Sequence, residues 1–578
     1  MKISEFIVKF LGRAGVEHVF TVCGGAIAFL GEALSRSKIK YIACHHEQAA
    51  AMAAEGYARV REGMGAVFVT SGPGGTNTVT GVSGCWTDHV PVMFFSGQSF
   101  TKQTIGTTGV RTLGVQEINI VDIVKPITKY AVMVTDPTEI HHHLKTAWKL
   151  AKSGRPGPVW LDLPADVQNS QLPDQKVLNT PKDGDSFFEL SEVIELLKSA
   201  KRPLVHVGQG VRLAKAIPQL FKFLEASKIP VVTARNGIDL IGSDHPLYIG
   251  RPGTFAQRGA NFAVQTCDVY LAIGTRLCLA QTGYNAKDYA RNAKIIQVDI
   301  DYAELHKDTV PVHLKIKADA RDFLWAMSSV KGWPDWSSWW MKCKSFQAKY
   351  PPVTDAQMYQ TYTVNSYGLI ETLSEYATPD DVIVTDMGFA FQCTAQAWRV
   401  KQGQRLIQNG GTAAMGWGLP AAIGAAIGSG RRVILIAGDG GMMMNIQELS
   451  TLAHHKLPVK IFLLNNSGYL TMRQSQQFAF GSYIASDEKT GLGFPNFQAV
   501  ARAHGVTPYW LGSLDQFNQK MLESDGPIFC EVNMDVNQEQ IPKSINRRLE
   551  DGSIKQTAIE DSYPFLPEEE IKENLCMR

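Results

Sequence analysis

Short apolar runs alternate with amphipathic segments along most of the chain. In the first part these runs are VEHVFTV, YIAC, GAVFVTS, PVMFFSGQ and PVWLDLP, and helical periodicity fills the intervals, most clearly over His46–Val60. Continuous short apolar runs are typical of strands buried on both faces, as in parallel sheets covered by helices. The pattern therefore predicts a doubly wound α/β domain over residues 1–175.

The same alternation begins again twice. A polar stretch with two prolines (168–186) indicates a linker. A second series, with PLVHVGQG, IPVVTAR, VYLAIGTRL and KIIQVDID, occupies 190–345, and a third, with DVIVTDMG, VILIAGDGG, VKIFLLNN and PIFCEVN, occupies 360–540. The predicted fold class is thus α/β with three doubly wound parallel-sheet domains. The tail 541–578 has few large apolar residues in any period, so we expect it to wrap another domain or to cover a site.

Composition excludes several classes of protein. The 578 residues are 44% hydrophobic and 19% charged, with a formal net charge of +2, which is ordinary globular composition. Without a basic stripe, no nucleic acid or anionic membrane is expected as a partner. The chain has no long apolar run and no secretory leader pattern, and its nine cysteines are scattered without ligand spacing. These features favour reduced thiols and a cytoplasmic location.

The strongest chemical signal combines two strand ends. Gly438-Asp439-Gly440 ends the run VILIA, and Asn465-Asn466 ends the run VKIFLL. The carboxyl ends of neighbouring parallel strands border the ligand crevice of an open α/β sheet. A carboxylate and an amide oxygen there are suitable ligands for Mg²⁺, and the glycines allow close approach to phosphates. Each motif alone is more simply a turn, but together they resemble the signature of thiamine diphosphate (ThDP) enzymes.

Further segments extend the resemblance to the acetohydroxyacid (acetolactate) synthase family, over about residues 1–540. In the order of that family the chain contains GGA (24–26), HEQAA (46–50), TSGPGGTN (70–77), VPVMFFSGQ (90–98), GRPGPVWLDLP (154–164) and MGWGLPAA (415–422). The resemblance implies domains of PYR, middle and PP type. It also implies that ThDP lies between the PYR domain of one subunit and the PP domain of its neighbour, so that the protein is a homodimer at least, or a tetramer.

The resemblance also assigns roles to individual residues. Glu47 would activate the cofactor, whereas in isolation it is more simply a helix N-terminal carboxylate. Gln116 and Gly25 would lie beside the bound intermediate, although Gln116 could instead be a solvated loop amide. The metal ligands would be Asp439, Asn466 and the Gly468 carbonyl. The remaining cofactor-binding set is Pro73, Asn77, Ala413, where the family usually has glycine, Met415, which would support the bent cofactor, Gly438, Gly440, Gly441 and Tyr469.

The implied chemistry is decarboxylation of pyruvate or a similar 2-keto acid and transfer of the acyl anion to a carbonyl acceptor. Three positions depart from the family. Ala280 replaces the arginine that binds the acceptor carboxylate, Ser475 replaces a tryptophan and Val115 a phenylalanine. We therefore expect a bulky acceptor that is not a 2-keto acid. These departures, with GYLTMRQSQ and the tail segments RRLEDGS and EDSYPFL, resemble a subgroup that includes the yersiniose-forming carboligase of surface-polysaccharide pathways. That resemblance predicts a nucleotide-linked ketosugar as acceptor. An aldehyde, a dione or water would also fit the departures.

The middle domain carries a second cofactor signal. The segments VGQGVRL (207–213), TARNG (233–237), GRPGTF (250–255) and VDID (298–301) follow those that hold FAD in the family, which predicts FAD in a structural role. Such glycines can also serve tight strand–helix turns. The alternative functions are a ThDP-dependent decarboxylase or C–C cleaving lyase or hydrolase, a flavin-linked oxidase and a non-catalytic subunit. The joint presence of Glu47, Asp439 and Asn466 argues against the last.

Overall fold

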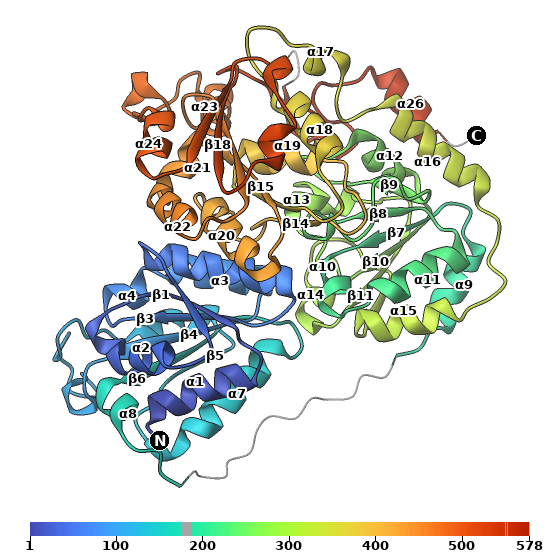
Figure 1. Cartoon of the computed structure of the whole chain (residues 1–578). Coiled ribbons are helices and arrows are strands. Elements are labelled where there is room, and N and C mark those ends of the chain that lie inside the picture. Colours follow the sequence, from blue (N-terminus) through green and yellow to red (C-terminus); the bar gives the residue numbers. More distant parts are fainter. Residues whose placement is uncertain (175–187, 549–550, 552, 577–578) are drawn as a thin grey trace.

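The computed structural model describes residues 1–174, 188–548, 551 and 553–576. They form three parallel six-stranded sheets that follow one another along the sequence (Figure 1). The predicted fold class is therefore confirmed. The predicted linker 168–186 lies outside the described residues from position 175 onward, and its first two residues belong to helix α8 (Ala165–Asn169). In the described part of the chain, no helix is long and apolar enough to cross a membrane.

The first sheet has the strand order β2-β1-β3-β4-β6-β5. Helices α1, α2 and α7 pack on one face, and α3, α5 and α6 on the other. The connections diverge between β1 and β3, and the strand ends at this point are where a ligand crevice forms. The elements are α1 (Ile3–Arg13), β1 (His18–Val22), α2 (Ala28–Ser35), β2 (Lys40–Ala43), α3 (Glu47–Arg61), β3 (Gly65–Val69), α4 (Pro73–Thr76), α5 (Val79–Thr87), β4 (Val92–Gln98), α6 (Ile120–Val124), β5 (Tyr130–Met133), α7 (Ile140–Lys152) and β6 (Val159–Pro164).

The second sheet has the order β12-β11-β10-β7-β8-β9. Numbered within the domain and taken from the other edge, this is 3-2-1-4-5-6, the order of dinucleotide-binding domains, with the divergence between β7 and β10. The elements are α9 (Ser191–Ser199), β7 (Pro203–Val207), α10 (Gln209–Leu213), α11 (Ile217–Ser227), β8 (Val231–Thr233), β9 (Tyr248–Gly250), α12 (Arg258–Thr266), β10 (Val269–Ile273), α13 (Leu279–Thr282), β11 (Lys294–Asp299), α14 (Tyr302–His306), β12 (Leu314–Lys317), α15 (Ala320–Ser328) and α16 (Ser337–Lys349).

The third sheet, β14-β13-β15-β16-β18-β17, repeats the strand order of the first. Helices α18 and α19 cover one face, and α20, α22 and α24 the other. Its divergence lies between β13 and β15, so the end of β15 borders the expected crevice. The elements are α17 (Asp355–Met358), α18 (Ser366–Tyr376), β13 (Val382–Thr385), α19 (Phe389–Ala397), β14 (Arg405–Ile407), α20 (Gly418–Ser429), β15 (Val433–Gly438), α21 (Asp439–Met444), α22 (Leu449–His454), β16 (Val459–Asn465), α23 (Leu470–Phe480), α24 (Phe497–Ala503), β17 (Thr507–Leu511), α25 (Lys520–Glu523) and β18 (Ile528–Asn533).

The C-terminal tail packs on the middle domain, as Figure 1 shows for α26 (Glu568–Leu575) against α12 and α16. Before this helix lies a short antiparallel pair, β19 (Arg547–Arg548) and β20 (Ile554–Lys555). Ile559 is buried in the middle-domain core. Glu560 accepts a hydrogen bond from Gln265 (2.8 Å) and pairs with Arg291. These described tail residues therefore pack on the middle domain.

Helices α3 and α20 join the first and third domains within the chain (Figure 1). Two glycines allow their backbones to touch. A Cβ atom at Gly424 would lie 1.8 Å from the Ala53 carbonyl oxygen, and one at Gly56 would lie 2.3 Å from the Ala421 carbonyl oxygen. Since real Cβ atoms do not approach so closely, the small residues of both helices are a requirement of this packing.

Candidate cofactor and metal site

The ends of β15 and β16 bring Asp439 and Asn466 together. These strands are neighbours, with Gly438 in register with Leu464. Asp439 Oδ2 accepts hydrogen bonds from the amides of Asn466 (3.1 Å) and Gly468 (3.0 Å), and its Oδ1 accepts one from Gly440 (2.7 Å). Burial raises the pKa of Asp439 to about 6, although the three amides oppose this shift. The carboxylate thus organises the loop that follows β16.

The oxygen atoms of this loop fit a magnesium ion. Asn466 is 3% exposed, and among the described residues its buried Oδ1 has no hydrogen-bond partner. Such an orphaned acceptor is costly unless an ion, water or ligand meets it. The Gly468 carbonyl accepts one bond, from the amide of Leu470 (3.1 Å), and keeps a second lone pair. A carboxylate, an amide oxygen and a backbone carbonyl are the hard ligands that Mg²⁺ takes alongside phosphate oxygens.

The glycines beside Asp439 have different functions. A Cβ at Gly438 would meet nothing within 4 Å, so this backbone faces open space in which a diphosphate can lie. At Gly440 a Cβ would be 2.2 Å from the ring of Tyr469, and at Gly441 it would be 2.3 Å from the Asp386 carboxylate. Gly440 and Gly441 are therefore required by packing, while Gly438 leaves room for a ligand.

Two buried acids, neither of them predicted from the sequence, hold the loop before α20. Asp386, at the end of β13, accepts the amide of Gly416 (3.0 Å), and burial raises its pKa to about 6. Glu55 of α3 is fully buried and accepts the indole N–H of Trp417 (2.7 Å). Asp386 follows the run DVIVT much as Asp439 follows VILIA, so its position at a strand end could have indicated a functional residue. No sequence pattern indicated the role of Glu55.

Just before the anchored residues Gly416 and Trp417 lie two predicted cofactor-binding residues, Ala413 and Met415. Ala413 has a φ of 58°, in the left-handed region, which gives a physical reason for the glycine usual in the family. Its amide donates to the Asn409 side chain at 3.0 Å. Met415 is 36% exposed and has its methyl group near Gly440, so a bulky apolar side chain stands beside the diphosphate loop.

Glu47 begins α3 and is bonded within its own domain. Asn77, which ends α4 (Pro73–Thr76), donates from Nδ2 to Glu47 Oε2 at 2.9 Å. The neighbouring residue Gln48 bonds to Asn445 (3.2 Å), which also donates to the Gly416 carbonyl (2.8 Å). The structure therefore brings the start of α3 to the Met415 loop inside a single chain.

Gln116 and Gly25 lie at the same crevice edge of the first domain but are solvent-exposed. Gln116 has a φ of 57°, and its carbonyl oxygen packs so close to Gly72 that a Cβ there would be 2.5 Å away. Its neighbour Glu117 is buried and accepts the amides of Ile105 and Leu113 (2.8 Å), which shapes the loop. A Cβ at Gly25 would meet nothing within 4 Å.

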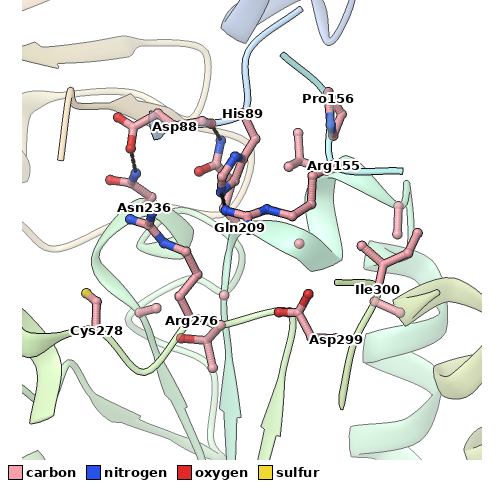
Figure 2. Close-up of a pocket in the computed structure, with 18 of the residues that line it drawn as sticks. Asp88, His89, Arg155, Pro156, Gln209, Asn236, Arg276, Cys278, Asp299 and Ile300 are labelled. Atoms are coloured by element: carbon pink, nitrogen blue, oxygen red, sulfur yellow. Dashed lines mark hydrogen bonds between the residues drawn. The ribbon is translucent and has the colours of Figure 1, made fainter. Parts of the chain in front are cut away.

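A separate cavity of about 260 Å³ lies at the divergence of the middle sheet. Figure 2 shows Arg276 and Asp299 on its wall, with Arg155 bonded to His89 (2.8 Å). Burial lowers the pKa of His89 to about 3, so the neutral ring accepts this bond. Ala280, which by the resemblance replaces the arginine that binds the acceptor carboxylate, also lines this cavity. Gly208 and Gly210 are packed against Gly274, so these glycines do serve the strand–helix turn.

The comparisons with known proteins match this architecture. Models of the thiamine pyrophosphate (ThDP) enzymes cover the N-terminal TPP binding domain at residues 1–123, the central domain at 190–327 and the C-terminal TPP binding domain at 386–532. The chain belongs to the thiamine pyrophosphate enzymes.

Within this class the chain is similar to acetolactate synthases. It is 33% identical to the acetolactate synthase isozyme 2 large subunit of Escherichia coli (strain K12), over 93% of this chain and 96% of that protein. It is 33% identical to a probable acetolactate synthase large subunit of Methanocaldococcus jannaschii, over 93% of this chain and 92% of that protein. It is 34% identical to the chloroplastic acetolactate synthase 2 of Nicotiana tabacum, over 92% of this chain and 82% of that protein. The similarity to the yersiniose-forming subgroup stays a prediction.

Proposed function

We propose that the protein is a ThDP- and Mg²⁺-dependent carboligase that decarboxylates pyruvate or a similar 2-keto acid and transfers the acyl unit to a carbonyl acceptor. The observation that carries this proposal is the convergence of two groups of residues. Glu47, held by Asn77, is tied through Gln48 and Asn445 to the loop of Met415. Next to that loop lies the diphosphate and metal loop. Full-length similarity to acetolactate synthase large subunits supports the same chemistry.

The residues divide the work between binding and proton transfer. When bound, ThDP supplies a thiazolium that accepts the electron pair left by decarboxylation. Asp439, Asn466 and the Gly468 carbonyl would hold Mg²⁺, and the open backbone at Gly438 would bind the diphosphate. Glu47 would hold a proton on Oε1, because Asn77 already occupies Oε2. The exposed amide of Gln116 would orient the acyl unit and its acceptor.

For the acceptor we propose a bulky carbonyl compound, such as a nucleotide-linked ketosugar. A guanidinium binds a carboxylate through two parallel hydrogen bonds, which the methyl group of Ala280 cannot replace. Ser475 on α23 and Val115, which is 86% exposed, leave the approach wide. A second candidate acceptor is another 2-keto acid, which similarity to the acetolactate synthases favours.

The deciding experiment follows carbon dioxide and product mass. The purified protein is incubated with ThDP, Mg²⁺ and pyruvate, alone and with ketosugar nucleotides, aldehydes and diones. A product one acetyl unit heavier than a sugar acceptor supports the first candidate, and acetolactate from pyruvate alone supports the second. Acceptor-independent release of carbon dioxide with free aldehyde would replace the carboligase by a decarboxylase. Oxygen consumption with pyruvate would indicate the oxidase.

We also propose that the middle-domain cavity binds FAD in a structural role. The dinucleotide-binding strand order, the arginines for phosphate groups and the carboxylate of Asp299 for ribose hydroxyls support this assignment. Asn236 further offers a buried Oδ1 without a partner among the described residues. Release of flavin from the denatured protein, with activity kept after flavin reduction, is the expected result. A preparation that neither carries nor binds FAD contradicts it.

Finally, we propose a homo-oligomer, a dimer at least, in which the ThDP site is shared between subunits. The structure has α3 on α20 of the same chain. Exchange of the first domain between two copies would form the same contact from two chains. Glu47 and the Met415 loop would then still lie together, but Glu47 would come from one subunit and the loop from the other.

A further inference from the structure

Arg473, on α23, is a buried cation that contacts backbone instead of acids. It is 8% exposed, and none of the described carboxylates forms an ion pair with it. Its guanidinium donates to four carbonyl oxygens: those of Asn466 (2.9 Å), Ser467 (3.0 Å), Ser486 (3.4 Å) and Val536 (2.9 Å). A planar guanidinium with five donors can hold several carbonyls in one plane, which no other side chain can do.

Hydrogen bonds from two sides therefore hold the loop 466–468. Its amides at Asn466 and Gly468 donate to Asp439, and its carbonyls at Asn466 and Ser467 accept from Arg473. The Asn466 side-chain oxygen and the second lone pair of the Gly468 carbonyl remain available to an ion. A Cβ at Gly468 would lie 2.4 Å from Arg473 Nη1, so the loop is packed directly on the guanidinium.

The surroundings of Arg473 show what its loss would do. Arg473 and Ser467 both line a cavity of about 900 Å³ between α23, the loop near Asp487 and the tail. Without the guanidinium, water from this cavity could hydrate the freed carbonyls, and the loop would no longer be confined to one conformation. The next residue, Gln474, donates to the Gln538 carbonyl (2.8 Å), so the same helix also holds the segment that leads into the tail.

We infer that Arg473 is a positioning residue of the metal site: it holds the 466–468 loop in the single conformation that leaves the Asn466 amide oxygen and the Gly468 carbonyl free for Mg²⁺. This inference rests on the proposed function for the identity of the ion. Partners that orient metal ligands are commonly worth about 10–100-fold in metal affinity.

The test compares Arg473→Met, Arg473→Lys and the control Arg431→Met. Arg431 also donates to three carbonyls, those of Asp380, Pro379 and Gly403, but lies before β15, at the opposite end of that strand from Asp439. Mg²⁺ binding is measured by titration calorimetry at saturating ThDP, together with melting temperature and the Mg²⁺ dependence of turnover.

We expect the Mg²⁺ dissociation constant to rise about tenfold or more in Arg473→Met and less in Arg473→Lys, with turnover largely restored at high Mg²⁺. Arg431→Met should bind Mg²⁺ like the wild type, whatever its melting temperature. If Arg473→Met does not fold, the dissociation constant of Arg473→Lys decides. Mg²⁺ affinity within about twofold of wild type in the folded Arg473 variants overturns the inference. Failure of the wild type to bind ThDP and Mg²⁺ would instead overturn the proposed function.

Discussion

Asn77 donates a hydrogen bond from Nδ2 to Glu47 Oε2 at 2.9 Å, across two helices of the first domain. The amide comes from the end of α4 and the carboxylate from the first turn of α3. This bond fixes the rotamer of Glu47 and occupies one of its two oxygens. The other oxygen, Oε1, can then exchange a proton with the bound cofactor, which is the task of a general acid–base group.

Replacement of Glu47 by Gln keeps the shape of the side chain and removes its ionisation. We expect turnover with pyruvate to fall roughly 10²–10⁴-fold, because general acid–base assistance is lost. ThDP binding by calorimetry and the melting temperature should remain near wild type. Glu17→Gln, which changes a surface partner of Arg61, is the matched control and should be silent. Wild-type turnover in Glu47→Gln would remove Glu47 from the mechanism.

The contact between α3 and α20 should not tolerate a single methyl group. Gly424→Ala places a Cβ 1.8 Å from the Ala53 carbonyl oxygen, so the helices must separate. We expect a loss of about 1–3 kcal/mol or more in stability, together with weaker ThDP binding. Gly31→Ala in α2, where a Cβ meets nothing within 4 Å, should be neutral or stabilising. Thermal unfolding and ThDP titration of both variants are the measurements, and equal behaviour of the two would contradict the packing argument.

Mixed oligomers decide whether the site is shared between subunits. Glu47→Gln and Asp439→Asn are each expected to be inactive. Co-expressed with distinct tags, they should recover up to about one quarter of wild-type activity if sites are shared, because half of the dimers are mixed and each mixed dimer has one intact site. Sites formed within one chain would give no recovery, since each would carry one substitution. Size-exclusion chromatography with light scattering gives the oligomeric state of the same samples.

The stability of the first domain should depend on Asp162. Ser96 (2.6 Å) and Gln98 (3.0 Å) donate to this carboxyl, but burial raises its pKa from 3.8 to about 7. Between these values the folded state keeps the proton and the unfolded state releases it. The contribution to stability is therefore complete below pH 3.8 and is lost as pH rises to about 7, by about 1.4 kcal/mol per pKa unit.

The measurement is the melting temperature of wild type and Asp162→Asn between pH 4 and 8. The difference between wild type and variant should shift against the wild type as pH rises and should level off above pH 7, because asparagine does not titrate. A difference that is independent of pH would show that Asp162 has the same charge in both states.

Strands inside the sheets were predictable, and most strands at the edges were not. The unpredicted strands are β5, β9, β12, β14 and β17, and each lies at the edge of its sheet. An edge strand is paired on one side only, so it can be short or half-exposed; β5, for example, has no fully buried residue. Continuous apolar runs indicate chiefly the strands that are buried on both faces, although the run YIAC also indicated the edge strand β2.

The strand-end motifs, together with the family resemblance, predicted roles for Asp439, Asn466 and Glu47, because the position of each depends on one strand and the turn that follows it. Such a unit is encoded by contiguous residues, and the three-domain α/β fold follows from repetition of the same units. Asp386 and Glu55 hold a loop that is far away in the sequence, and Arg473 joins the nearby 466–468 loop to the distant carbonyl of Val536. Which carbonyl or amide each of them meets depends on how separate segments pack, and no local pattern records that contact. The tertiary structure decided these anchors, and with them the joining of α3 to the Met415 loop.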